Sequence, residues 1–266
     1  MKVAIVTGSS SGIGYALCNL LSKKGIKVYG ISRTISENEN VINISGDVTK
    51  ADDIKKIFAS IYEKEGRIDY LINNAGMGIS GSVEATSLED FESIFNVNLK
   101  GTFITSKEIL PYMRKNNSGK IVNIGSVASE FSIPFQTFYS SSKAAIKAFS
   151  EALNNEVSPY GISVCTILPG DVKTNFTKSR KTNENELEAY EKRVSKSIGL
   201  MAKDEQNGMD VQYVSKVIYK TINKKRMPIQ KTIGFKYKVF IFLKRFLPTK
   251  VVNKLVGAIY AFKKER

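Results

Sequence analysis

The sequence predicts an α/β fold in which a doubly wound parallel sheet is covered by helices on both faces. Strand-like and helix-like segments alternate over the first two-thirds of the chain, without an internal repeat or a low-complexity linker, and this alternation favours a parallel sheet. Apolar runs such as VAIV (3–6) and IVNI (121–124) suit strands that are buried on both sides. We therefore expect a single large domain to occupy most of the 266 residues.

The elements of this sheet follow in order along the chain. The first strand, KVAIVTG (2–8), ends at a glycine, and the next helix, GIGYALCNLLSKKG (12–25), closes with the Lys-Lys-Gly of a typical helix terminus. The later segments continue the alternation. We expect further strands at 27–33, 41–48, 68–76, 120–126 and 162–170, and helices at 51–66, at 88–115 and around Tyr139 and Lys143.

Residues 171–208 break this alternation, because they are polar and charged and have little apolar periodicity. Long polar insertions beside a site are often lids, so we expect a mobile flap over the substrate, although a solvated helical excursion without gating fits equally well. A helix around 210–223 and a short strand near 227–230 complete the main fold. The expected catalytic domain is thus 1–232, followed by a C-terminal extension over 233–266.

Composition narrows the chemistry that the chain can perform. Histidine is absent, which excludes Ser-His and Cys-His catalysis and leaves Tyr, Lys, Asp or Glu for acid–base work. The two cysteines, Cys18 and Cys165, stand in apolar surroundings without metal-ligand spacing, so we expect free buried thiols and no metal site. Neither a signal peptide nor an apolar run approaching the ~20 residues of a membrane-spanning helix is present, and we expect a cytoplasmic protein.

The formal net charge of +15 is concentrated near the C-terminus. Residues 224–266 contain thirteen Lys or Arg and one acid, Glu265, a net charge of +12 that leaves about +3 for residues 1–223. Within 234–266 we expect one helix over 235–247, ended by Pro248, and then a second helix. The apolar sides are expected to hold Phe235, Val239, Phe242, Leu243 and Phe246 in the first helix, and Val251, Val252, Leu255, Val256, Ile259 and Tyr260 in the second.

Two interpretations of this extension stay open at the level of the sequence. Amphipathic helices flanked by Lys and Arg are typical of contact with anionic lipid, which makes 234–266 a candidate for contact with the inner membrane surface. Equally, the apolar sides could pack on the domain or on another subunit of an expected homodimer or homotetramer. Both suit a lipophilic substrate. Nucleic acid is not an expected partner, because no recognition motif accompanies the charge.

A nucleotide site is predicted at TGSSSGIG (7–14), between the first strand and the first helix. Glycines permit a tight turn and a close approach of the backbone to a pyrophosphate, and the helix N-terminus supplies N–H donors. The spacing G-x-x-x-G-x-G departs from the commoner G-x-G-x-x-G. After the second strand, Ser32 and Arg33 stand where NAD-binding domains often place an acid, and a guanidinium favours the extra phosphate of NADP. Asp47, after the third strand, is a candidate partner for the adenine edge.

Seven fragments together resemble the short-chain dehydrogenase/reductase family in its NADP-preferring branch. They occur in the order and at the usual spacings of that family over about residues 1–230: TGSSSGIG (7–14), DVT (47–49), NNAG (73–76), NVNLKG (96–101), NIGS (123–126), YSSSK (139–143) and PGDVKT (169–174). The resemblance implies a Rossmann-type sheet of about seven strands in the order 3-2-1-4-5-6-7. The chain departs from the family pattern by continuing about 35 residues past the last expected strand.

The resemblance also implies site residues, position by position. It implies catalytic roles for Asn98, Ser126, Tyr139 and Lys143. The implied contacts with NADP(H) are Gly8, Ser10, Ser11, Gly12, Ile13 and Gly14 at the phosphates, Arg33 and Thr34 at the 2′-phosphate, Asp47 and Val48 at the adenine, Asn74, Ala75 and Gly76 at the ribose, and Tyr139, Lys143, Pro169, Gly170, Val172 and Thr174 at the nicotinamide side.

Tyr139 and Lys143 form the predicted acid–base pair, because residues four apart on a helix share one face. Hydride transfer to a carbonyl leaves an alkoxide that needs a proton, which Tyr139 can donate. A cation within ~4–6 Å lowers the pKa of a phenol, and Lys143 can supply it together with the oxidised nicotinamide. Ser126 can hydrogen-bond the substrate oxygen. The resemblance implies further that Lys143 binds the nicotinamide ribose and that Asn98 positions a water.

We therefore expect an NADP(H)-dependent oxidoreductase acting on a carbonyl or secondary alcohol. A lipophilic substrate is expected, such as a steroid, a retinoid or a long-chain keto compound. The alternatives are a 3-oxoacyl-thioester or small-ketone reductase, and a catalytically silent NADP-binding protein that its basic tail recruits to membranes.

Overall fold

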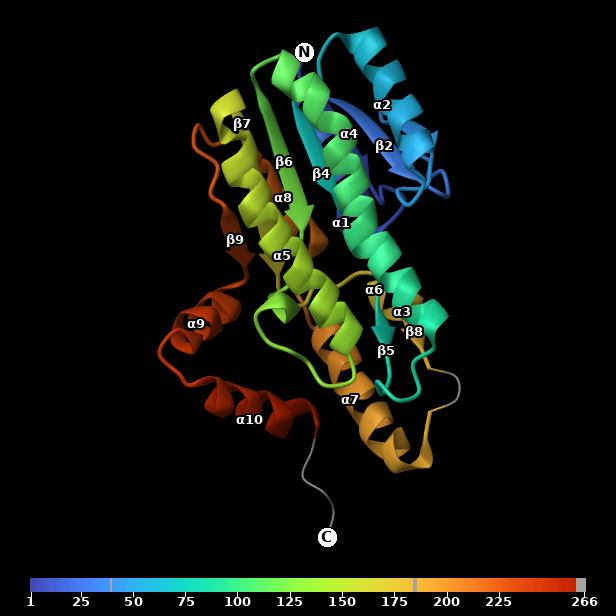
Figure 1. The fold of residues 1–266 in the computed structure, drawn as a ribbon, viewed down its shortest axis with the longest axis vertical. Coiled ribbons are helices and arrows are strands. Elements are labelled where there is room, and N and C mark those ends of the chain that lie inside the picture. Colours follow the sequence, from blue (N-terminus) through green and yellow to red (C-terminus); the bar gives the residue numbers. More distant parts are fainter. Residues whose placement is uncertain (39, 184–185, 262–266) are drawn as a thin grey trace.

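Seven parallel strands form the central layer of the molecule (Figure 1). The structure is a computed structural model and describes residues 1–38, 40–183 and 186–261. The strand order is β3-β2-β1-β4-β6-β7-β9, which confirms the predicted order, since β5 and β8 form a separate small sheet. The bounds are β1 Val3–Thr7, β2 Lys27–Ser32, β3 Ile42–Ser45, β4 Tyr70–Asn73, β6 Gly119–Ile124, β7 Ile162–Pro169 and β9 Gln230–Ile233.

Side-chain alternation along the strands divides the core into two halves. In β1, Val3 and Ile5 join a cluster with α2, α4 and α5, whereas Ala4 and Val6 join a second cluster with α1 and α8. Successive strand residues point to opposite faces, so a strand covered on both sides must be apolar throughout. The helices that cover the sheet are α1 Gly12–Lys23, α2 Ala51–Glu65, α4 Gly101–Lys115, α5 Thr137–Val157 and α8 Val211–Ile222.

The helix expected over 88–115 is interrupted. α3 (Leu88–Phe95) and α4 are joined by a π-helical turn, η1 (Asn96–Lys100). Within it the Asn98 side chain turns inward, where its Oδ1 accepts from the Met77 N–H at 2.8 Å and its Nδ2 donates to the Met77 carbonyl at 3.0 Å. The wider turn thus allows Asn98 to contact a residue 21 positions earlier in the chain. Helical periodicity in the sequence does not predict such a contact.

Three strands differ in extent from the expectation. The last strand lies at 230–233 instead of 227–230, with Gln230 opposite Thr166 of β7. β3 and β4 are shorter than expected. The chain leaves the sheet after Ser45 and Asn73, and the residues that follow contribute to the site.

Residues 171–208, expected as a flap or as a helical excursion, contain two helices and a short strand. They form α6 (Phe176–Ser179), β8 (Lys181–Thr182) and α7 (Glu188–Gln206). β8 pairs in parallel with β5 (Ile79–Ser80), which ties this segment to the loop after β4. The C-terminal extension forms α9 (Phe235–Lys244) and α10 (Thr249–Tyr260), and α10 packs against α7 (Figure 1).

Both cysteines are buried free thiols, and burial raises the pKa of Cys18 and of Cys165 to about 12. Within the described parts of the chain, no helix combines the length and the apolarity needed to cross a membrane.

Candidate active site

A cavity of about 860 Å³ lies at the carboxyl ends of the strands. Segments that follow β1, β2, β4, β6 and β7 form its wall, and doubly wound sheets bind their ligands at this edge. All but two of the site residues predicted from the sequence line it. The exceptions are Gly14 and Asn98, which lie directly behind the wall.

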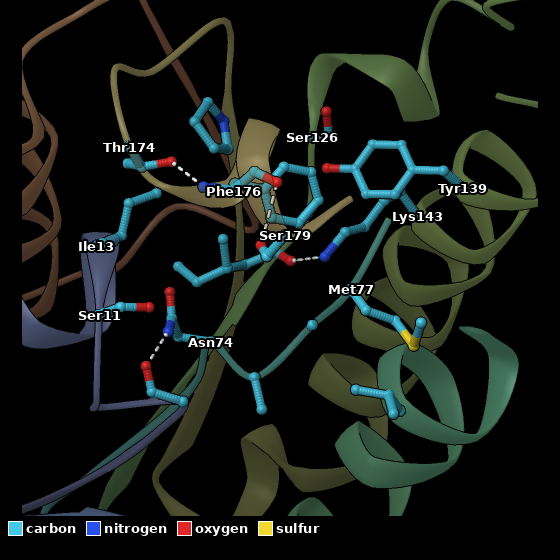
Figure 2. Close-up of a pocket in the computed structure, with 18 of the residues that line it drawn as sticks. Ser11, Ile13, Asn74, Met77, Ser126, Tyr139, Lys143, Thr174, Phe176 and Ser179 are labelled. Carbon is cyan, nitrogen blue, oxygen red and sulfur yellow. Dashed lines mark hydrogen bonds between the residues drawn. The ribbon is translucent and has the colours of Figure 1, made fainter. Parts of the chain in front are cut away.

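Two glycines shape the turn after β1. Gly8 has a φ of +64°, a backbone conformation that favours glycine, and a Cβ there would lie 2.8 Å from Ala75 Cα. A Cβ at Gly14, in the first turn of α1, would overlap the Gly8 carbonyl oxygen. The Asn74 amide donates to the carbonyls of Thr7 (3.1 Å) and Gly8 (3.0 Å) and so fixes the turn to the end of β4 (Figure 2). The turn therefore holds Ser10, Ser11, Gly12 and Ile13 along the cavity wall at the N-terminus of α1.

Arg33 and Thr34 follow β2 and are exposed at one end of the cavity. Asp47, with Val48 next to it, borders the same end, and its Oδ1 accepts hydrogen bonds from the Thr49 N–H (2.9 Å) and hydroxyl (2.8 Å). Burial opposes ionisation of Asp47, but these bonds and the charge of Arg33 lower the pKa of the carboxyl below its ordinary value. An ionised carboxylate and an exposed guanidinium thus stand at this end.

The residues of the cavity fit a nicotinamide dinucleotide. The open space at Gly12, where a Cβ would meet only Thr174 at 3.6 Å, leaves the α1 N-terminus accessible to a diphosphate. Arg33 and Asp47 line the end of the cavity where the adenosine would bind, and Ala75 and Gly76 also line the wall. No cluster of His, Cys, Asp and Glu suited to a metal ion occurs within the described ranges.

Ser126, Tyr139 and Lys143 meet at the opposite end (Figure 2). Ser126 follows β6, while Tyr139 and Lys143 lie one turn apart on α5. The side chains of Ser126 and Tyr139 lie next to one another, close enough for the Ser126 hydroxyl to act on the Tyr139 phenol. Lys143 Nζ donates to the Ile124 carbonyl at 2.8 Å and lies 5.7 Å from the centre of the Tyr139 ring.

Burial dominates the electrostatics of these groups. It raises the pKa of Tyr139 above its ordinary value, although the hydrogen bond from Ser126 and the positive charge of Arg180 act in the opposite direction. Burial also lowers the pKa of Lys143 to about 8. Sequence reasoning assigned the lowering influence on Tyr139 to Lys143 and did not find Arg180.

Asn98 supports the site from behind. It is fully buried, and besides Met77 it reaches α5, where its Nδ2 donates to Ser142 Oγ at 3.0 Å. The Ser142 hydroxyl in turn donates to the Tyr139 carbonyl at 2.8 Å. Ser142 had no predicted role, but it links Asn98 to the turn of α5 that carries Tyr139.

The segment 171–208 adds three residues next to Tyr139 that the sequence did not reveal. The Phe176 ring centre lies 5.8 Å from that of Tyr139. The buried Arg180 guanidinium lies 5.8 Å from the Phe176 ring and forms an ion pair with Glu205 of α7. These partners come from a segment without motif or periodicity, and the ion pair spans 25 positions, so no local signal marks them. The cavity wall contains further apolar side chains, Met77, Val127, Ala128, Ile133 and Met201, and also polar ones, Glu89, Glu92, Ser93, Asn96 and Gln136.

The C-terminal extension also reaches the site. Tyr237 of α9 covers Gly170, where a Cβ would overlap the tyrosine ring. The Tyr237 hydroxyl accepts from the Asp171 N–H at 3.1 Å and donates to the Asp171 carboxylate. Gly170 lines the cavity together with Pro169, Val172 and Thr174, the four residues predicted for the nicotinamide side. The pattern of the C-terminal extension predicted apolar helix faces, and nothing in it indicated this contact.

Comparisons with known proteins agree with this geometry. The model of the short chain dehydrogenase family matches residues 2–185, and the chain belongs to that family. It is 37% identical over 266 residues to a 3-ketodihydrosphingosine reductase from Bacteroides thetaiotaomicron, covering 98% of this chain and 99% of that protein.

Solved structures share the fold over nearly the whole chain. A short-chain dehydrogenase from Streptomyces avermitilis superposes with a TM-score of 0.84 at 28% identity, covering 96% of this chain and 95% of the other. ElxO with NADP bound gives 0.74 at 27% identity (90% and 99% covered). A Burkholderia phymatum short chain dehydrogenase/reductase in complex with NAD gives 0.79 at 22% identity (92% and 93% covered), a likeness of fold alone.

Proposed function

We propose that the chain is an NADPH-dependent reductase that transfers a hydride to the keto group of a long-chain lipophilic substrate, with Tyr139 as the proton donor. The observation that carries this proposal is the meeting of Ser126, Tyr139 and Lys143 in one cavity with the glycine turn after β1. We expect the enzyme to act as a homodimer or homotetramer.

Bound NADPH would supply the hydride to the carbonyl carbon. The Ser126 hydroxyl is placed to hydrogen-bond the carbonyl oxygen, and the adjacent Tyr139 hydroxyl can give that oxygen its proton, which yields a secondary alcohol. Lys143 has a pKa of about 8, so it can hold a proton beside Tyr139 and help to return one to the Tyr139 hydroxyl after each transfer. The half-buried Tyr139 is otherwise a weak acid, because burial raises its pKa.

Selectivity for NADPH is proposed from Arg33, an exposed guanidinium at the adenosine end. Arg33→Asp should lower kcat/KM for NADPH by about ten- to a hundred-fold, since hydrogen bonds to charged groups contribute ~1.5–3 kcal/mol. The same variant should lose little with NADH, which serves as its internal control. An unchanged NADPH/NADH ratio would remove Arg33 from cofactor selection.

A lipophilic keto substrate is supported by apolar side chains such as Met77, Ile133 and Met201 in the cavity wall and by the relative named 3-ketodihydrosphingosine reductase. The deciding experiment follows NADPH absorbance with 3-ketodihydrosphingosine, with a 3-oxoacyl thioester and with a small ketone. Tyr139→Phe should lower turnover by ~10²–10⁴-fold and retain NADPH binding. Preference for the thioester or the small ketone would favour the alternative reductase, and binding of NADPH without any turnover would favour a silent binding protein.

A further inference from the structure

The C-terminal extension turns an apolar side away from the domain. α9 contacts the body through Tyr237 and Lys244, and Lys244 Nζ pairs with the Glu130 carboxylate at 3.0 Å. On the opposite side, Phe235, Phe242 and Phe246 are 81%, 57% and 70% exposed. An amphipathic helix ordinarily buries its apolar stripe against the core, and here the stripe faces outward.

α10 repeats this arrangement. Its Tyr260 lines the cavity, while Val251, Leu255 and Ile259 are exposed at successive turns. We use the name outer apolar surface for the exposed residues of both helices: Phe235, Val239, Phe240, Phe242, Leu243, Phe246, Val251, Leu255 and Ile259. Both helices lie at one edge of the molecule, outside the layers formed by the sheet and its covering helices (Figure 1).

Such a concentration differs from the scattered apolar residues of an ordinary protein surface. Among the described residues, 22 large hydrophobic side chains are exposed, and ten of them fall within 235–259. Contiguous exposed apolar patches mark surfaces that bind a partner or a membrane.

The positive charge around the outer apolar surface indicates what kind of partner binds there. Residues 224–261 contain ten Lys or Arg and no acid. Lys238, Lys250 and Lys254 are exposed on the same two helices, and Arg245 is exposed directly after α9. A second copy would bring the same basic surface against itself, because a two-fold interface uses the same patch on both subunits. Anionic lipid headgroups supply the opposite charge instead, and each basic residue near such a surface contributes about 1 kcal/mol to the free energy of binding.

We propose that the outer apolar surface, together with these basic side chains, docks the protein in the plane of an anionic lipid bilayer. The inner side of α10 contributes Tyr260 to the cavity, so one helix separates the bilayer from the catalytic groups. Delivery of a lipid substrate from the bilayer to the cavity follows from this placement and rests on the proposed function, whereas docking does not.

The test uses full-length protein and vesicles of phosphatidylcholine, with or without ~30% phosphatidylglycerol. Phe242→Ser/Phe246→Ser should reduce co-sedimentation with the anionic vesicles at least tenfold, because burial of each aromatic side chain contributes ~1.5–3 kcal/mol. Leu88→Ser, which removes a 75% exposed apolar residue elsewhere, should bind as the wild type does. High salt should weaken wild-type binding.

Equal sedimentation of the double variant and the wild type would overturn docking, as would the absence of wild-type binding. A wild-type oligomer that the double variant splits, without any vesicle binding, would make the surface an interface between copies and also overturn it. NADPH binding, measured for every variant, verifies folding. An inactive protein that still docks would contradict only the proposed reduction.

Discussion

Lys143 is a buried amine, 5% exposed, and its Nζ donates a hydrogen bond to the Ile124 carbonyl. Burial disfavours the charged form, which lowers the pKa from 10.5 to about 8. At neutral pH the side chain is therefore mostly protonated, but it releases its proton more readily than a surface lysine. That property suits a group that exchanges protons with Tyr139, and it costs folding free energy.

Replacing Lys143 should show this cost as a change in how the free energy of unfolding depends on pH. Because the pKa in the folded protein lies below that in the unfolded chain, the unfolded chain binds more protons between pH 8 and 10.5, so the contribution of Lys143 to stability rises with pH across this window. In urea unfolding without cofactor, the free energy of unfolding of the wild type should rise relative to that of Lys143→Met by up to about 3 kcal/mol between pH 7.5 and 10.5. The exposed Lys55→Met on α2 should show no such shift. A difference for Lys143→Met that stays constant with pH would contradict the lowered pKa.

At the scale of the elements, the π-helical turn η1 is the feature that brings Asn98 into the site. Its side chain satisfies both backbone groups of Met77 and also contacts Ser142. π-turns inside helices are rare and occur often at functional sites. The turn is thus held by one side chain that belongs to the fold and to the site at once.

Asn98→Ala should accordingly destabilise the protein more than the loss of one hydrogen bond. It leaves the Met77 N–H and carbonyl without their partner, and each buried unsatisfied group costs ~1–3 kcal/mol. We expect a loss of about 2 kcal/mol or more in urea unfolding, whereas Ser142→Ala, which keeps the Met77 bonds, should lose only about 1 kcal/mol. Equal losses of unfolding free energy in the two variants would show that the Met77 backbone does not need its hydrogen bonds to Asn98.

The elements also show what the sequence could predict. Apolar strand runs and amphipathic helices are local patterns, so the alternation of strands and helices was predictable. The order of the seven strands was implied by the resemblance to the family, which rests on spaced motifs. The π-turn was not predictable, since it depends on a contact between Asn98 and Met77 across 21 positions. The short pairing of β5 with β8 was not predicted, because a strand of two residues is too short to show an alternation of apolar and polar side chains.

The same distinction holds for the site. Motif residues such as Ser126, Tyr139 and Lys143 could be placed in advance because each stands at the end of a strand or on a helix with a recognisable pattern. Arg180 and Tyr237 could not be placed, because their partners, Glu205 and Asp171, lie 25 and 66 positions away, and no local pattern reports a contact over such a distance.

For the whole molecule, the C-terminal extension has two sides with different consequences. Its inner side is fastened at several points: Tyr237 to Asp171, Lys244 to Glu130, and the Ala261 carbonyl to Arg193 Nε at 3.1 Å. Burial opposes ionisation of Glu130, but its bonds with Lys147 and Lys244 lower the pKa overall, so the junction is an ionised one at neutral pH. The extension is therefore part of the catalytic body as well as a candidate membrane surface.

Tyr237→Ala and Phe242→Ser/Phe246→Ser should separate these two sides. Removing the Tyr237 ring opens a void over Gly170 and takes away the partner of Asp171, and loss of a large buried aromatic costs ~3–5 kcal/mol. We expect Tyr237→Ala to lower the unfolding free energy by about 3 kcal/mol. It should also weaken NADPH binding and turnover of a short water-soluble ketone without vesicles, because Gly170 and its neighbours line the cavity where we propose that the nicotinamide binds. Phe242→Ser/Phe246→Ser, on the exposed side, should leave all three measurements near wild type. If Tyr237→Ala were equally silent in the absence of vesicles, the contact of Tyr237 with Gly170 and Asp171 would contribute nothing to the site.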